Sequence, residues 1–224
     1  MYSLILSRRK TRPSANMRST APRRPLFLSL EGLDGSGKTT QLDRVVDFCE
    51  HHNATGVVVT REPGGTEVGE RIRHILLEHA SLHAQTELLL VFAARIQHVK
   101  AVIAPALALG KTVVCDRYLD ATYAYQGYGR GLDISLIDAM TRLLDIPLPD
   151  LTIYFDVPVP VALARRAGRA ADRIEAEGEE FFERVREGYR RRAQDEPGRF
   201  VVIPATGSLS EVGEAVDAAL ARRW

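Results

Sequence analysis

A glycine-rich loop between an apolar run and a helical segment is the feature that most constrains how this chain folds. Gly32, Gly37, Lys38 and Thr39 satisfy the spacing G-x-x-x-x-G-K-[ST], which is typical of phosphate-binding loops. In such a loop the backbone N–H groups point at the bound phosphates, and the N-terminus of the next helix adds partial positive charge. The pattern therefore predicts a strand, a loop that binds a nucleoside triphosphate, and a helix, in that order.

Apolar and helical segments alternate along the rest of the chain. The expected strands are 26–31, 56–60, 111–116, 151–157 and 199–203, and the expected helices are 38–52, 67–79, 85–109, 133–144, 158–166, 178–194 and 210–222. This alternation indicates an α/β protein in three layers, with a parallel sheet of about five strands flanked by helices. Ligands bind beyond the carboxyl ends of such strands, so the loops at 32–37, 61–66 and 116–131 are expected to form one site.

The distribution of charge separates the first residues from the rest. The 224-residue chain has a net charge of +1, but residues 1–25 contain only basic charged residues, so the remainder is mildly acidic. We interpret residues 1–25 as a basic, disordered extension, with an organellar transit peptide or a natural start at Met17 as alternatives. Residues 26–224 are expected to form a single domain with a lid at about 165–175. An acidic domain argues against a broad nucleic-acid surface.

Hydropathy and cysteine content indicate the compartment. No apolar run approaches the roughly 20 residues that span a bilayer, so we expect no membrane contact. Cys49 and Cys115 lie in apolar contexts and are interpreted as buried thiols of a reducing compartment rather than as a disulfide. We therefore expect a cytoplasmic protein.

Charged residues at the strand ends suggest phosphoryl transfer. Lys38 is expected to reach the β- and γ-phosphates, and the Thr39 hydroxyl is expected to bind Mg²⁺. Asp116 closes an apolar strand, where a carboxylate either positions Mg²⁺ or simply caps the strand. Arginines on separate loops could neutralise a second anionic substrate, although any one of them could be a surface residue. These arginines are Arg61, Arg95, Arg117 and those of the segment 165–173.

Taken together, these motifs resemble those of bacterial thymidylate kinases over most of residues 26–224. The motifs that carry the resemblance are Gly32–Gln41, Arg61–Thr66, Asp116–Tyr118, Ala124–Gly127 with Gly129–Gly131, and Asp172–Glu175 followed by Phe181–Arg186 and Tyr189. The phosphate loop alone is shared with many NTPases. The segments Arg-Glu-Pro-Gly-Gly-Thr and Ala-Tyr-Gln-Gly make the resemblance specific.

The resemblance implies a homodimeric kinase of the P-loop NTPase fold that transfers the γ-phosphoryl group of ATP to thymidine 5′-monophosphate with Mg²⁺. It places ATP at Gly32, Leu33, Asp34, Gly35, Ser36, Gly37, Lys38, Thr39 and Thr40, and Mg²⁺ at Thr39 and Asp116. It places the monophosphate at Asp34, Arg61, Pro63, Phe92, Arg95, Arg117, Thr122, Tyr125 and Gln126. The implied catalytic residues are Lys38, Asp34, Arg117 and Arg169.

Some roles within this set follow from the resemblance in more detail. Arg95 would read a thymine carbonyl, and Tyr125 would crowd a ribose 2′-hydroxyl. Because Gly35 places no basic side chain in the phosphate loop, a lid arginine, Arg169, would supply charge to the transition state.

Two departures from the family pattern leave the base preference open. Val91 stands where the family usually has phenylalanine, with Phe92 one place later, and Ala121 stands where serine is common. A monophosphate kinase with relaxed base preference is therefore an alternative. A nucleotide-dependent regulatory module is another, but it would leave the acceptor motifs without a purpose. A nucleic-acid binder is motivated only by residues 1–25.

Overall fold

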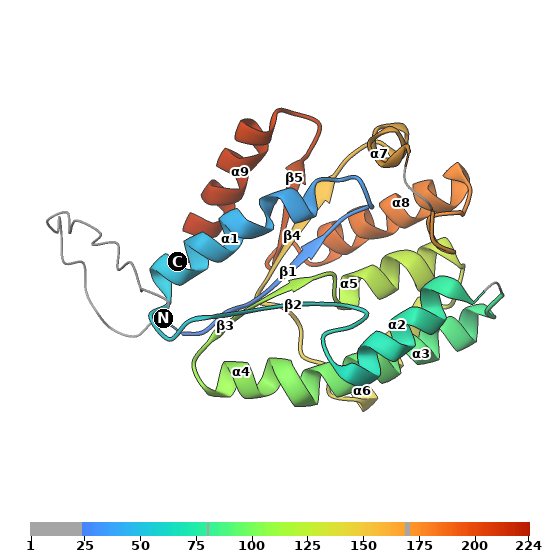
Figure 1. Cartoon of the computed structure of the whole chain (residues 1–224), viewed down its shortest axis with the longest axis horizontal. Coiled ribbons are helices and arrows are strands. Elements are labelled where there is room, and N and C mark those ends of the chain that lie inside the picture. Colours follow the sequence, from blue (N-terminus) through green and yellow to red (C-terminus); the bar gives the residue numbers. More distant parts are fainter. Residues whose placement is uncertain (1–23, 80, 169–170) are drawn as a thin grey trace, which may run out of the picture.

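The computed structural model describes residues 24–79, 81–168 and 171–224, and it confirms the expected α/β architecture (Figure 1). Five parallel strands form one sheet in the order β2-β3-β1-β4-β5. The strands are β1 (Phe27–Glu31), β2 (Val57–Arg61), β3 (Thr112–Asp116), β4 (Leu151–Asp156) and β5 (Phe200–Pro204). The helices are α1 (Lys38–His52), α2 (Glu67–Glu78), α3 (Ala84–His98), α4 (Ala104–Ala108), α5 (Leu119–Thr122), α6 (Ile134–Leu143), α7 (Val159–Arg166), α8 (Glu179–Asp195) and α9 (Leu209–Ala221), with π-helical segments η1 (Val99–Ile103) and η2 (Tyr123–Gly129).

The two faces of the sheet are covered by different helices. Leu28 and Leu30 of β1 point to the face where α1 and α9 pack side by side. Phe27 points to the opposite face, which α3, α4 and α6 cover. The central strands β1, β3 and β4 are buried on both faces, which explains why they are nearly continuous apolar runs. Polar residues at the ends of these strands are therefore the informative exceptions.

The long helix expected at 85–109 is continuous but not regular. It begins as α3, passes through the π-helical segment η1 and ends as α4. Within the described residues, the stretch Ala84–Ala108 also has the length and mean hydropathy of a membrane span. This stretch nevertheless carries Glu87 and Arg95, both almost fully buried inside the domain. A helix in the core of a protein can have the same length and mean hydropathy as a membrane span.

The segment expected to be a loop at 116–131 is instead mostly helical, as α5 and η2. Two of its three glycines, Gly127 and Gly129, mark close packing, whereas Gly131 lies in the turn that follows. A Cβ atom on Gly129 would lie 2.8 Å from the ring of Phe181 on α8. In return, a Cβ atom on Gly188 of α8 would lie 2.9 Å from the Cα of Ala124. The glycine content of the segment therefore serves a close helix contact, which composition alone does not reveal.

Candidate active site

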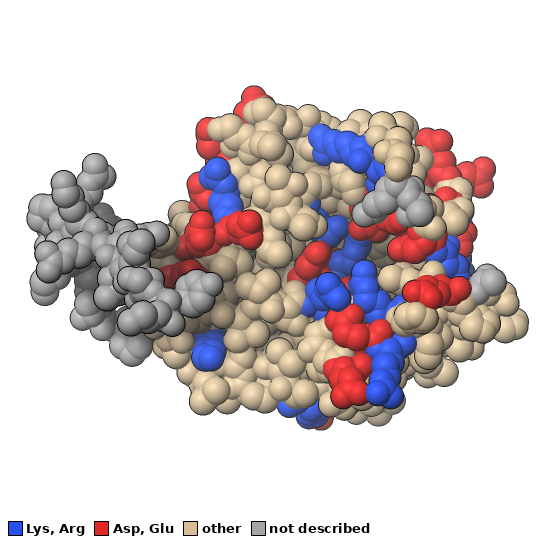
Figure 2. Space-filling view, viewed as in Figure 1, with Lys and Arg blue, Asp and Glu red and all other residues tan. Residues whose placement is uncertain are grey.

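A cavity of about 360 Å³ opens beyond the carboxyl ends of β1, β2 and β3. Among the residues expected to bind the monophosphate, the structure brings these to its wall: Asp34, Pro63, Arg95, Arg117, Thr122, Tyr125 and Gln126. In Figure 2, charged side chains of both signs gather on the side of the molecule toward which these strand ends point. The three loops that the sequence assigned to one site thus meet there.

The phosphate loop joins β1 to α1 through three glycines with positive φ. Gly32, Gly35 and Gly37 have φ angles of 143°, 87° and 93°, which side-chain-bearing residues rarely adopt. Gly35 is also confined by packing, because a Cβ atom there would lie 2.4 Å from the carbonyl oxygen of Ala162 on α7. Position 35 therefore has no room for a side chain of any kind. The absence of a basic residue in the loop has a steric cause.

Opposite charges meet where the loop faces the cavity. Arg117 donates to the Asp34 carboxylate at 2.7 Å and to the carbonyl oxygen of Gly32 at 2.8 Å. Lys38 Nζ lies 3.8 Å from the same Asp34 oxygen. Burial opposes ionisation of Asp34, but Arg117 and Lys38 hold its pKa well below the usual range. Asp34 is thus an anion between two cations, and both cations are available to phosphates.

Burial also opposes the ionisation of Lys38. Its ammonium group is almost fully buried and donates to the carbonyl oxygen of Leu33 at 3.3 Å. Burial, followed by the charge of Arg117, lowers the pKa of Lys38, although Asp34 and Asp116 counteract this shift. A cation held in this way gains most when an anion arrives, since the anion replaces the solvation that burial removed.

The residues expected to hold Mg²⁺ lie at the phosphate loop and at the end of β3. Asp116 Oδ1 is buried and has no hydrogen-bond partner among the described residues, which is costly unless a ligand satisfies it. Thr39 is exposed at the start of α1. Carboxylate and hydroxyl oxygens are ligands that suit Mg²⁺, so these residues fit the ion that the family implies.

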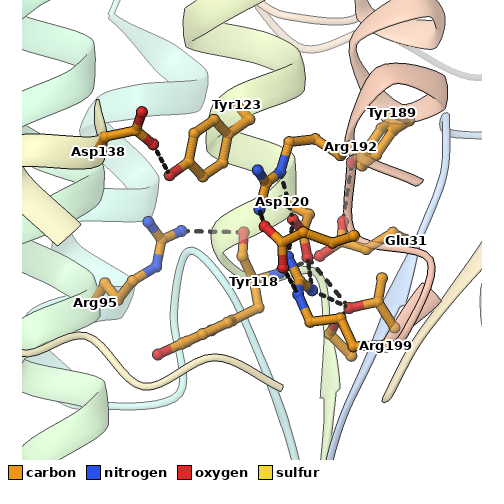
Figure 3. Close-up of polar contacts among 12 residues, drawn as sticks. Glu31, Arg95, Tyr118, Asp120, Tyr123, Asp138, Tyr189, Arg192 and Arg199 are labelled. Atoms are coloured by element: carbon orange, nitrogen blue, oxygen red, sulfur yellow. Dashed lines mark hydrogen bonds and ion pairs between the residues drawn. The ribbon is translucent and has the colours of Figure 1, made fainter. Parts of the chain in front are cut away.

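Arg95 is the most buried cation of the cavity, with 1% of its surface exposed. Its Nε donates to Glu62 at 2.7 Å, and its NH2 group donates to the carbonyl oxygen of Tyr118 at 3.1 Å, as Figure 3 shows for the latter. Its NH1 group has no partner among the described residues, nor does the buried hydroxyl of Thr122. Both residues line the cavity. The cavity wall therefore contains two polar groups, on Arg95 and Thr122, that a bound ligand could satisfy.

Two residues expected at the monophosphate lie elsewhere. Arg61, the last residue of β2, is exposed and pairs with Glu70 of α2 at 3.0 Å. Phe92 is buried in the core with Leu88 and Val99. Helix geometry explains why Phe92 does not line the cavity. Val91 lies four residues before Arg95 and shares the cavity face of α3, whereas Phe92 is turned about 100° away from that face. Val91 therefore occupies the wall where an aromatic ring was expected.

Other cavity residues escaped the sequence reasoning. Arg73 lines the cavity and donates to the carbonyl oxygen of Pro63 at 3.1 Å. Arg73 lies three residues before Leu76 and four before Leu77, which also line the cavity. This helical spacing could have indicated that Arg73 lies on the same face. Glu87 accepts from Gln126 at 2.7 Å. An acidic residue within an apolar helix could have indicated it.

Glu31 is a further residue that the sequence reasoning passed over, although it ends an apolar strand directly before the phosphate loop. It accepts from the Tyr189 hydroxyl at 2.9 Å (Figure 3) and from the Tyr118 backbone N–H at 2.8 Å. Tyr189 in turn accepts from Arg117 at 3.2 Å. Burial, with a contribution from Asp120, raises the pKa of Glu31 to about 8. Glu31 thus orders the backbone and the tyrosine that support Arg117.

The described part of the lid approaches the cavity from α7 and from the residues before α8. Arg165 donates to the carbonyl oxygens of Gly35 at 3.3 Å and of Ala205 at 3.0 Å. Arg173 is tied to Glu87 at 2.7 Å and to the carbonyl oxygen of Leu76 at 2.8 Å. These arginines are therefore engaged with protein groups. Arg169, the expected catalytic lid residue, lies outside the described residues.

Comparison with known proteins agrees with this geometry. The family model described as thymidylate kinase matches residues 30–216. A thymidylate kinase of Pseudomonas putida (strain GB-1) is 51% identical over 199 residues, covering 87% of this chain and 94% of its own. One of Desulfosudis oleivorans is 50% identical, covering 88% and 97%. The crystal structure of the thymidylate kinase from Ehrlichia chaffeensis superposes with a TM-score of 0.74 at 36% identity, covering 88% of this chain and 100% of its own. The chain belongs to the thymidylate kinase family.

Proposed function

We propose that this protein transfers the γ-phosphoryl group of ATP to thymidine 5′-monophosphate, giving thymidine diphosphate and ADP. The observation that carries the proposal is that the phosphate-loop cation Lys38 and the acceptor-side cation Arg117 share one anion, Asp34, at the mouth of a nucleotide-sized cavity. A donor and an acceptor would therefore bring their phosphates to the same point. Positioning two anionic groups and neutralising their charge is most of what phosphoryl transfer requires.

Each residue has a role that follows from its placement. The N–H groups of the phosphate loop and Lys38 would hold the donor phosphates, with Ser36 in the loop and Thr40 in the first turn of α1. Arg117 would hold the acceptor phosphate, and Asp34 would keep Arg117 oriented until that phosphate arrives. Arg95 and Thr122 would meet the polar edge of the base with the groups that have no partner. Tyr125 and Gln126 would border the sugar and base from η2.

Thr39 and Asp116 would hold Mg²⁺, which when bound supplies charge neutralisation at the transferred phosphoryl group. Because Gly35 has no room for a side chain, we propose that the remaining positive charge comes from the lid, through Arg169. The Arg169→Ala variant should lower kcat more than it raises KM, because charge on the moving oxygens matters mainly in the transition state. An effect on KM alone would contradict this role.

A second candidate is a monophosphate kinase of relaxed base preference, and Val91 favours it. An aliphatic side chain at the cavity wall cannot stack on a base as an aromatic ring does. Steady-state kinetics with thymidine, deoxyuridine, deoxycytidine and deoxyguanosine monophosphates would decide between the two. A kcat/KM for thymidine monophosphate at least about tenfold above the others supports strict thymine recognition. Similar values for several bases would replace it with the second candidate.

We also propose a cytoplasmic homodimer that packs through the long helix. The support is the exposed side of α3, where Leu89 is 59% exposed and Ala93 is exposed one turn later. Apolar residues on one exposed helix face are typical of an interface between copies. The buried free thiols of Cys49 and Cys115 suit a reducing compartment. Sedimentation equilibrium of the protein and of a Leu89→Glu variant would test the dimer.

A further inference from the structure

A chain of buried polar contacts lies behind Arg95 and ends away from the cavity. Glu62 accepts from Arg95 Nε at 2.7 Å through one carboxylate oxygen. Its other oxygen lies 2.9 Å from His98 Nδ1, and His98 Nε2 lies 2.6 Å from the hydroxyl of Thr60. Glu62, Arg95 and His98 are all at least 96% buried. Hydrogen bonds in such an environment are directional and costly to leave unmade.

This chain determines which part of Arg95 is free. A guanidinium group has five N–H donors in a rigid plane. Glu62 takes the Nε edge and the carbonyl oxygen of Tyr118 takes NH2, so NH1 alone has no partner among the described residues. Rings on both sides, those of Phe92 at 5.4 Å and Tyr118 at 5.1 Å from the guanidinium carbon, limit its rotation. Because Arg95 lines the cavity, NH1 is the part of its guanidinium group that is left for a ligand.

His98 contributes by fixing Glu62. With the proton on Nδ1, His98 donates to Glu62 and accepts from the Thr60 hydroxyl through Nε2, which satisfies every group of the chain. The loop before α2 is built around this pair. A Cβ atom on Gly65 would lie 2.7 Å from His98 Nε2 and 2.6 Å from the Thr60 hydroxyl. Gly65 therefore leaves space for the side chain of His98 rather than for a ligand.

We propose that Glu62 and His98 are positioning residues for acceptor recognition, acting through Arg95. Glu62 lines the cavity beside Arg95 and orients its guanidinium group. His98 and Thr60 lie outside the cavity lining and orient Glu62. The loop Arg61–Thr66 thus serves the acceptor through its second residue, because Arg61 itself pairs with Glu70 at the surface. This inference rests on the proposed function, in which Arg95 meets the base of the acceptor nucleotide.

The test compares substitutions that differ in one hydrogen bond. His98→Leu removes the donor to Glu62, whereas His98→Asn keeps an N–H donor at the position of Nδ1. Glu62→Gln keeps the shape but loses the charge. We expect His98→Leu and Glu62→Gln to raise KM for thymidine monophosphate about tenfold or more, with KM for ATP changed less than twofold. His98→Asn should restore most of the loss.

A double-mutant cycle separates positioning from a general structural role. In an Arg95→Ala background, His98→Leu should add less than about twofold to KM for the monophosphate, since the residue through which it acts is absent. Fully additive effects, or equal changes in the KM values of ATP and the monophosphate, would overturn the inference. Thr60→Val removes only the contact with His98 and is less disruptive to folding. If both Thr60→Val and Glu62→Gln leave the KM for the monophosphate unchanged, the positioning role is also refuted.

The wild-type enzyme separates this inference from the proposed function. A wild-type protein that turns over no monophosphate would contradict the proposed function itself. An active wild type whose monophosphate KM is insensitive to Glu62→Gln and His98→Leu would leave that function intact and refute only the positioning role. Thermal unfolding of each variant identifies a fall in apparent kcat that merely follows loss of folded protein, a loss that leaves KM unchanged.

Discussion

Replacing Lys38 by methionine tests whether the phosphate loop is built for a ligand rather than for stability. In the free protein the ammonium is 5% exposed, and its contacts are the Leu33 carbonyl at 3.3 Å and Asp34 at 3.8 Å. Both are long for charge-assisted hydrogen bonds. We expect Asp34 to keep its 2.7 Å contact with Arg117 in the variant, so the Asp34 carboxylate stays paired.

The structure sets opposite expectations for stability and activity. Replacing a poorly paired buried charge by an apolar side chain of similar size should leave stability unchanged or raise it by up to about 2 kcal/mol. Removing a preorganised cation from the transferring phosphates should cost about 3–4 kcal/mol, or a factor of 10²–10³ in kcat. Lys38→Met should therefore be an inactive enzyme that is at least as stable as the wild type.

Three measurements check this expectation. They are kcat from a coupled ADP assay, the Kd of thymidine monophosphate by calorimetry, and the thermal midpoint without nucleotide. The Kd should change less than threefold, because Arg117 and Arg95 hold the acceptor. Lys111→Met, at the opposite end of β3, is a matched control that should leave kcat unchanged. A lower thermal midpoint together with lost monophosphate binding would refute the reasoning, since Lys38 would then support the loop itself.

The pH dependence of stability gives a second readout for Lys38. Its pKa in the folded protein lies below the ordinary 10.5 because of burial. In the interval between these values the unfolded chain binds more protons than the folded protein. Wild-type stability should therefore rise as the pH increases toward 10.5, and this rise should be reduced in Lys38→Met.

Three further predictions concern other residues of the site. Tyr125→Ala should relax discrimination against ribonucleotides, and an unchanged ratio of kcat/KM for deoxy- and ribonucleoside monophosphates would contradict this. Burial raises the pKa of Glu31 from 4.5 to about 8, so the folded protein keeps a proton that the unfolded chain loses, and wild-type stability should fall between these pH values. Glu31→Gln should remove that fall in urea unfolding at several pH values. Gly35→Ala should lower the free energy of unfolding by about 1–3 kcal/mol more than Gly37→Ala, because only the former meets Ala162. Equal losses would show that positive φ alone is responsible.

Much of the fold followed from local patterns in the sequence. The helix after the phosphate loop is Lys38–His52, as expected, and Asp133 caps α6 by accepting from the Ser135 N–H. These features depend on neighbours in the chain. The helical character of 116–131 did not follow, because Gly129 is explained only by its packing against α8, which begins 50 residues later.

The candidate site divides in the same way. Residues on the loops after β1 and β3 meet because parallel strands end at one edge of the sheet. Side-chain direction was harder to predict: Arg61 and Phe92 lie next to cavity residues in sequence but do not line the cavity, because Arg61 pairs with Glu70 and Phe92 packs in the core. Glu62 and Glu31 contact partners on other elements, His98 and Tyr189. The sequence does not show which distant residues the fold brings into contact.

The contact between Gly35 and α7 has a mechanical consequence. The carbonyl oxygen of Ala162 rests against the Cα of Gly35, and Arg165, from the last turn of the same helix, donates to the Gly35 carbonyl oxygen. We expect the backbone at residue 35 and α7 to move together. A phosphate group that displaces the loop should therefore also displace this helix, at whose end the proposed lid segment begins.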